Sequence, residues 1–211
     1  VAGGMSGYPD GRTHDPDFDM TESEVEHAIV VESFAPLLDV YERHPTWNAD
    51  IEMQGLMVEV LARRHPAVLE RLRSLAGRGQ IELVSLHYSD QLFLAYPRRD
   101  LERSLDLTRQ VFATQGLPLS TVVFAQEGQF GEGLLAFMRD HGLGAAVLAK
   151  NLLFHMRGGE TEGLFFRAFG VDVVVGGRGG THGDLDVSWT GPGDGELFAT
   201  GGANPYLGRR L

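Results

Sequence analysis

The chain has 211 residues, 43% hydrophobic and 22% charged, a balance that predicts one sizeable hydrophobic core and excludes a disordered chain. Its formal net charge of -11 argues against nucleic acid as a partner, because phosphate backbones are bound by clustered lysines and arginines. There is no cysteine, which excludes a disulfide framework, a thiolate nucleophile and a cysteine-ligated zinc site.

The first part of the chain predicts two long helices and two short strands. Thr21 and Glu24 form a capping-box pattern that begins a helix over residues 22–43. The stretch "TWNADIEM" predicts a strand, followed by a helix over residues 54–77 that we expect to break or kink near His65-Pro66. The stretch "QIELVSL" predicts the next strand.

The second part continues the alternation of helices and strands. "RRDLERSLDLTRQVFATQG" has helical periodicity and closes on Gly116, and a shorter helix over residues 131–141 closes on Gly142. "STVVFAQ", "AAVLA" and "VDVVVGG" predict three further strands. We therefore expect about five strands, paired in parallel because crossover helices bring successive strands back in one direction. After Gly176 the sequence is rich in glycine and polar residues, and only "ELFAT" predicts a strand.

Glu127 is the leading candidate for a catalytic residue. It lies in "FAQEGQFGEG" (124–133), where an apolar stretch ends on a carboxylate and three glycines follow. α/β enzymes place reacting groups at strand tips, because the scaffold holds the residue while the loops leave room for substrate. The structural alternative is that Glu127 caps the next helix or pairs with an arginine, a description that fits Glu132 well.

Two stretches carry a resemblance to a known family. "GRGQIELVSLHYSDQLFLAYP" (77–97) resembles the second signature of glycoside hydrolase family 57, and "VVFAQEGQFGEGL" (122–134) resembles its nucleophile signature. The resemblance covers roughly residues 20–160 and implies a (β/α)7-type barrel that acts on α-linked glucans by a retaining mechanism, with Glu127 as nucleophile. "QEGQFG" is also similar to the Asp-x-Phe-Gly stretch of family 38 α-mannosidases, related barrels whose strand-tip acid binds zinc.

The sequence departs from the family 57 pattern in three places. Asp90 stands where the family usually has His, and the family's His-Gln-Pro segment has no counterpart. The Asp-rich signature of the acid/base residue does not occur before Leu211, and "GPGDGE" (191–196) is the nearest acidic candidate.

Four further residues are candidates for substrate binding. His87, Tyr88 and Asp90 lie where a strand gives way to its loop, and their imidazole, phenol and carboxylate groups suit sugar hydroxyls. Glu52 ends the predicted strand before it. Glu82, within a strand, is expected either to be buried and face the barrel interior or to pair with Arg78.

These observations predict an α/β protein with a (β/α)7-type barrel, incomplete in this chain. We expect residues 1–211 to form a single catalytic-type domain that lacks the first and last strands. The predicted function is retaining hydrolysis or glucan transfer on α-linked polysaccharide or oligosaccharide. The alternatives are a non-catalytic glycan-binding or assembly relative and a metal-dependent, mannosidase-like hydrolase.

The expected partner is a carbohydrate substrate, with no cofactor and no metal, and the oligomeric state stays open. No apolar run approaches the roughly 20 residues of a membrane-spanning helix, so we expect no membrane partner and a cytoplasmic protein.

Overall fold

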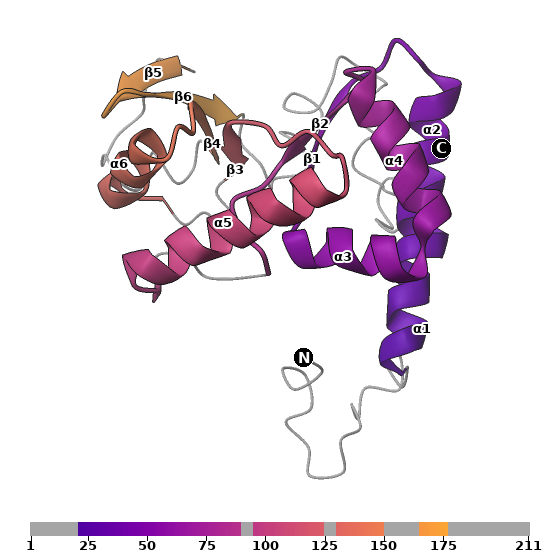
Figure 1. The fold of residues 1–211 in the computed structure, drawn as a ribbon. Coiled ribbons are helices and arrows are strands. Elements are labelled where there is room, and N and C mark those ends of the chain that lie inside the picture. The colour runs from indigo at the N-terminus through magenta and orange to yellow at the C-terminus, as the bar shows by residue number, and fades with distance from the viewer. Residues whose placement is uncertain (1–20, 90–94, 125–129, 150–164, 177–211) are drawn as a thin grey trace.

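The computed structural model describes residues 21–89, 95–124, 130–149 and 165–176, which form an α/β fold (Figure 1). The helices are α1 (Glu22–His27), the π-helix η2 (Ala28–Phe34), α2 (Ala35–Arg43), α3 (Gly55–Arg64), α4 (Pro66–Gly77), α5 (Arg98–Thr114) and α6 (Glu132–Asp140). The strands are β1 (Ala49–Glu52), β2 (Ile81–Val84), β3 (Val122–Phe124), β4 (Ala145–Ala149), β5 (Phe165–Ala168) and β6 (Val171–Gly176).

The predicted helix over residues 22–43 is confirmed, but a π-helical segment divides it. The helix starts with the predicted capping box. The Thr21 hydroxyl accepts a hydrogen bond from the backbone N–H of Glu24, and the Glu24 carboxylate accepts one from the backbone N–H of Thr21. At the end of η2, the N–H of Ala35 donates to the carbonyl of Val30, five residues earlier. Pro36, which has no N–H to donate, lies in the first turn of α2, and this gap in the bonding fits the change of helix type.

The predicted break at His65-Pro66 is also confirmed, because α3 ends at Arg64 and α4 begins at Pro66. Glu26 of α1 contacts this junction: Arg64 Nη1 donates to its carboxylate at 2.5 Å, and His65 Nε2 lies 3.0 Å from its other oxygen. Burial raises the pKa of Glu26, but the hydrogen bonds and charges of His65 and Arg64 outweigh this and lower it overall. Ionised Glu26 therefore holds α1 against the junction of α3 and α4.

The strands form two sheets. In the first, β1 pairs in parallel with β2, and Asp50 and Glu52 stand opposite Glu82 and Val84. In the second, the order is β3-β4-β6-β5, and β3, β4 and β6 are parallel. The five strands expected from the sequence are present, and each of the pairs β1–β2, β3–β4 and β4–β6 is parallel as predicted.

Strand β5 was not predicted, and it is antiparallel to β6. Phe169 and Gly170 form the two-residue turn between these strands, with φ angles of 53° and 84°. A tight hairpin turn with two positive φ angles usually carries Asn-Gly or Asp-Gly. Phenylalanine is rare in this conformation, so the sequence contains no recognisable turn signal here.

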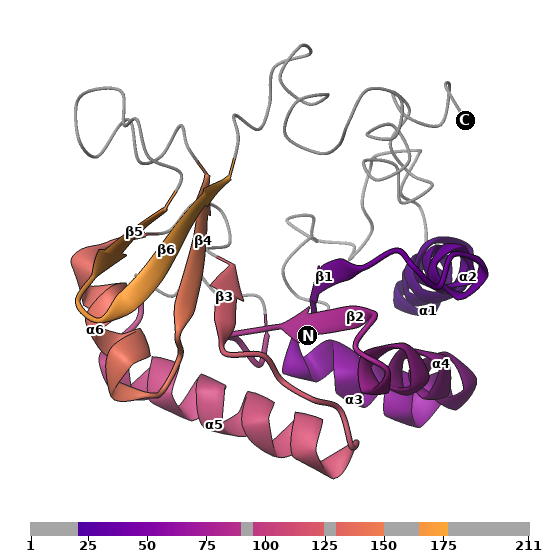
Figure 2. The same cartoon turned by 90° about the horizontal axis from the view of Figure 1, so that it is seen from above.

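Helices cover one face of the strands, and the core lies between them (Figure 2). One hydrophobic cluster packs Ile81 and Leu83 of β2 against α2, α3 and α4. A second cluster packs Val123 and Ala146 against α5 and α6. Of the residues that alternate with these, Asp50, Glu52 and Glu82 are exposed on the other face, whereas Val84 is buried. Because no helix of the described ranges covers this face in Figure 2, we call it the open face; closure of the strands into a barrel remains a prediction.

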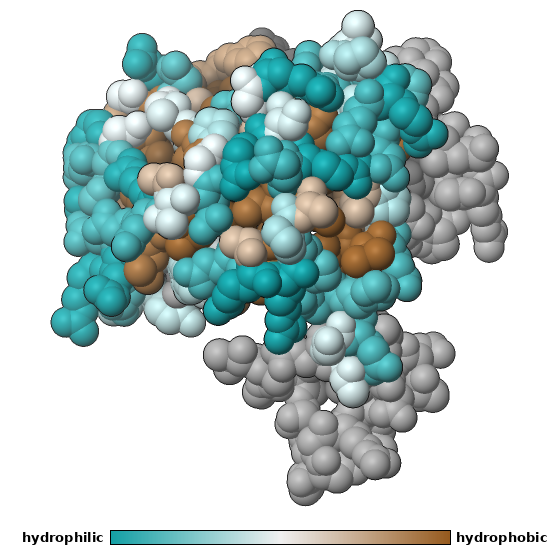
Figure 3. Space-filling model, turned by 45° about the vertical axis from the view of Figure 1, so that its right-hand side comes forward, coloured by the Kyte–Doolittle hydropathy of each residue, from teal (hydrophilic) through white to brown (hydrophobic). Residues whose placement is uncertain are grey.

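Within the described ranges, every helix is too short or too polar to cross a membrane. Figure 3 shows one side of the surface, where hydrophobic residues form separate brown patches among hydrophilic side chains.

Candidate active site

The candidate site begins at the carboxyl ends of β1 and β2. Glu52 is the last residue of β1, and the N–H of Met53 donates to the carbonyl of Val84, the last residue of β2, at 3.1 Å. Because the two strands are parallel, the residues that follow them emerge at the same edge. Glu52 and His87 therefore belong to neighbouring strand ends, as the sequence predicts.

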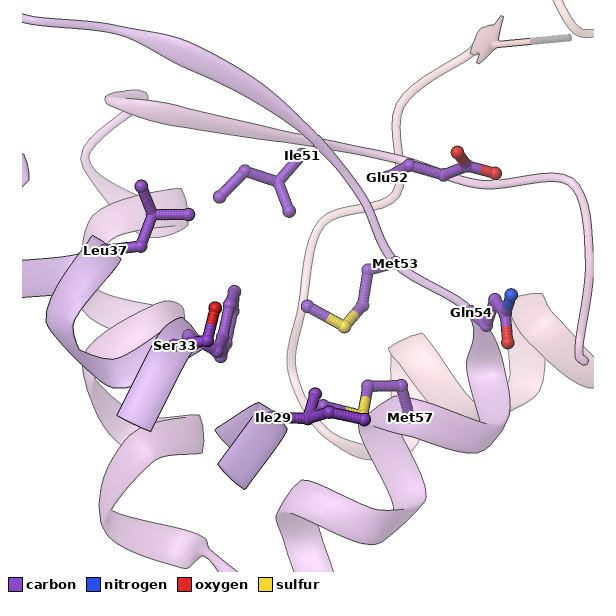
Figure 4. Close-up of a pocket in the computed structure, with 9 residues that line it drawn as sticks. Ile29, Ser33, Leu37, Ile51, Glu52, Met53, Gln54 and Met57 are labelled. Atoms are coloured by element: carbon purple, nitrogen blue, oxygen red, sulfur yellow. The ribbon is translucent and has the colours of Figure 1, made fainter. Parts of the chain in front are cut away.

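Glu52 borders a cavity of about 390 Å³ between η2, α2, β1 and the start of α3 (Figure 4). The lining is mainly apolar and includes Leu37, Ile51 and Met53. The carboxylate of Glu52 points away from Ile51 and Leu37 in Figure 4, because successive side chains of a strand point to opposite faces. Glu52 thus directs its charge away from the apolar cavity.

His87 is a buried side chain, with only 1% of its surface exposed. Its backbone carbonyl accepts a hydrogen bond from the N–H of Gly55 at 3.2 Å and one from the Ser85 hydroxyl at 3.2 Å. The start of α3 therefore fixes the loop after β2.

Tyr88 packs between α3 and α5. Its hydroxyl donates to Glu59 of α3 at 3.1 Å, and its backbone N–H donates to the Ser104 hydroxyl of α5 at 2.9 Å. Burial raises the pKa of Tyr88, and the hydrogen bond to Glu59 raises it further. The supporting residue Glu59 has no signal in the sequence, because the contact joins two residues that are 29 positions apart.

Asp90 and Glu127 lie outside the described residues. Glu127 follows Phe124, the last residue of β3, by three positions. The candidate acid/base stretch 191–196 is likewise outside.

Both predictions for Glu82 are wrong, because its side chain is exposed rather than buried and its described partner is not Arg78. Arg78 donates through Nε to the side-chain oxygen of Gln80 at 2.8 Å, whereas Glu82 accepts from the Ser120 hydroxyl on the open face. Asp50 stands directly opposite Glu82, and its pKa is raised by partial burial of the carboxyl group and then by the charge and hydrogen bond of Glu82. Sequence reasoning missed Asp50, although its alternation with Glu52 in "ADIE" places both carboxylates on one face.

Among the described residues, histidine and carboxylate side chains form no group of three or more that could hold a metal ion.

Parallel strands covered by helices, with polar side chains at and after the strand ends, define an α/β protein, and comparisons with known proteins give its relatives. No family model matches the chain. An alpha-amylase from Pyrococcus horikoshii is 26% identical over 121 residues, 55% of this chain and 18% of the amylase. A 4-alpha-glucanotransferase from Thermococcus litoralis is 26% identical over 139 residues, 64% of this chain and 20% of the transferase.

The crystal structure of 4-alpha-glucanotransferase from Thermococcus litoralis has a similar fold, with a TM-score of 0.63 and 21% identity. The similarity covers 74% of this chain and 25% of that structure. Together these relatives confirm the resemblance to glycoside hydrolase family 57. The matches span about a fifth of the length of the curated relatives.

Proposed function

We propose that this protein is a retaining glycoside hydrolase or glucan transferase that acts on α-linked polysaccharide or oligosaccharide, with Glu127 as the nucleophile. The observation that carries the proposal is the agreement of sequence and fold on one kind of relative, since both similarities include a 4-alpha-glucanotransferase. The position of Glu127 just after β3 supports it, because strand ends present reacting groups on a rigid scaffold.

The chemistry requires two carboxyl groups. In a retaining enzyme they stand about 5–5.5 Å apart; one attacks the anomeric carbon while the other protonates the leaving oxygen and later activates water. Glu127 takes the first role in this proposal. The acidic residues of "GPGDGE" (191–196) are the nearest candidates for the second.

The proposed substrate-binding residues are Glu52, His87, Tyr88 and Asp90. Carboxylates accept hydrogen bonds from sugar hydroxyls, and an imidazole can donate or accept. The support is positional: Glu52 and His87 belong to neighbouring strand ends, and the N-terminus of α3 holds the loop that leads to Asp90.

The test compares Glu127→Gln with Glu132→Gln, a matched control in the same stretch. Glu132 is the first residue of α6, where a glutamate stabilises the helix start. We expect Glu127→Gln to abolish turnover of an α-linked glucan, measured by chromatography of the products, with little change in the unfolding midpoint. Glu132→Gln should leave turnover close to that of the unmodified protein.

A second variant identifies the role of the lost carboxylate. In Glu127→Ala, azide should occupy the vacated space and restore partial activity on an activated glycoside, giving a product of inverted configuration. If Glu127→Gln retains activity and unfolds at a much lower temperature, Glu127 is a structural residue and the proposal fails.

A further inference from the structure

Three side chains form a line across successive strands on the open face. Asp50 of β1 stands opposite Glu82 of β2, and Glu82 accepts a hydrogen bond from the hydroxyl of Ser120, which lies just before β3. The helices pack against the other face, so this line is separate from the hydrophobic core.

Ser120 joins the two sheets. Its backbone N–H donates to the carbonyl of Leu83 at 2.9 Å, and its hydroxyl oxygen accepts from the N–H of Val122 at 2.9 Å. The same hydroxyl donates its proton to Glu82. Ser120 therefore links the start of β3 to β2.

These bonds give the two carboxyl groups different roles. A hydroxyl has one proton to donate, and Ser120 donates it to Glu82, so the Glu82 carboxylate already accepts one hydrogen bond. Two ionised carboxylates on directly opposite residues would repel each other. Protonation of Asp50 relieves this repulsion, because it removes one of the two negative charges. Protonated Asp50 can also donate a hydrogen bond to Glu82.

The described neighbours of the pair on this face supply no positive charge. The next residue of β1 on this face is Glu52, another acid, and the next residue of β2 is the apolar Val84. Among the described residues, neither Asp50 nor Glu82 takes part in an ion pair with a basic side chain. Burial and the neighbouring Glu82 both raise the pKa of Asp50, in agreement with the geometry.

We propose that Asp50 and Glu82 share one proton, carried by Asp50, and that this pair and Ser120 form a hydrogen-bonded clamp that positions β3 against β2. The clamp is a property of the sheet itself. Its effect on turnover rests on the proposed function, because β3 leads to Glu127.

The shared proton makes the clamp sensitive to pH. The pKa of Asp50 is higher in the folded chain than the value of about 3.9 expected when the chain is unfolded. The stabilising contribution is therefore complete below that unfolded value and is lost as the pH rises through the raised pKa of the folded state.

The first experiment measures the protonation directly, by ¹³C NMR titration of the side-chain carboxyl groups. We expect Asp50 to titrate above about 3.9, the ordinary value for aspartate, and Glu82→Gln to move its midpoint downward. An Asp50 midpoint at or below about 3.9 that does not respond to Glu82→Gln would overturn the proposal.

Thermal unfolding of Asp50→Asn gives an independent readout. The amide keeps a donor for Glu82 without a charge, so the melting temperature of the variant relative to the unmodified protein should rise between about pH 4 and pH 7. The matched control is Asp172→Asn on β6, whose carboxylate lies 3.4 Å from Arg167 across the strand. That variant removes a favourable partner and should show no such rise. A pH-independent difference for Asp50→Asn counts against the proposal.

Turnover tests the positioning step. Ser120→Ala should lower kcat by about tenfold to a hundredfold with little change in KM, the range expected when a reacting group is misplaced. Ser120→Thr, which keeps the hydroxyl, should restore most of kcat, and equal kcat in the alanine and threonine variants would contradict a positioning role. If the unmodified protein lacks glucan activity, the proposed function fails, whereas the titration still decides whether Asp50 and Glu82 share a proton.

Discussion

At the scale of single residues, Tyr88 shows how the helices hold a predicted sugar-binding residue in place. Its hydroxyl donates to Glu59, and its backbone N–H donates to Ser104. The sequence identified Tyr88 by its place after a strand, but the partners come from α3 and α5, and their approach depends on the whole fold. Its role in sugar binding stays a prediction.

We expect Tyr88→Phe to lower the free energy of unfolding by about 1 kcal/mol, the usual net value of a hydrogen bond, because the bond to Glu59 is lost. Urea denaturation measures this loss. In a double-mutant cycle, Glu59→Gln should change stability less in the Tyr88→Phe background than in the unmodified protein.

The contrary result is unchanged stability together with weaker oligosaccharide binding in calorimetry. It would mean that the hydroxyl serves the sugar rather than Glu59.

At the scale of elements, most of the fold was predictable because its signals are local. The capping box at Thr21, the proline at the α3–α4 break and Gly116 after α5, with a φ of 63°, each act within a few residues. The features that were missed lack a local signal: Ala35 bonds Val30 in a π-helical register, and Phe169 stands where a hairpin usually has asparagine or aspartate.

The start of α3 gives the sharpest test of packing between elements. A Cβ added to Gly55 would lie 2.9 Å from Cδ2 of Tyr88 and 3.4 Å from Cα of Thr108. Overpacking of this kind usually costs about 1–3 kcal/mol, so we expect Gly55→Ala to lower the free energy of unfolding by that amount in urea denaturation.

Gly133→Ala in α6 is the matched control, because an added Cβ there meets nothing within 4 Å. It should stabilise the protein by about 0.5–1 kcal/mol, the gain from replacing a helical glycine with alanine. Equal stability changes in the two variants would contradict the close contact between α3 and the loop after β2.

At the scale of the whole molecule, the two faces of the strands differ in polarity. The helices bury the apolar residues of one face, while the acidic side chains of Asp50, Glu52 and Glu82 lie on the other. The sequence predicted the covered face through its apolar periodicity. It could not identify the second carboxylate of the proposed mechanism, because that residue must be brought to Glu127 by a strand distant in sequence, and no motif marks it.

The negative charge of the protein also affects how a test for bound metal must be designed. A chain with a net charge of -11 attracts divalent cations without any specific site, so a trace of bound metal has no diagnostic value. In the proposed mechanism both reacting groups are carboxyls, and we therefore expect dialysis against a chelator to leave glucan turnover unchanged.

The zinc content of the purified protein, measured by mass spectrometry before and after chelation, is the accompanying readout. Stoichiometric zinc that is removed together with activity, and whose return restores it, would contradict the two-carboxylate mechanism and favour the metal-dependent, mannosidase-like alternative. Restoration is the deciding step, because a chelator that merely destabilised the fold would lower the unfolding midpoint and zinc would not recover the lost turnover.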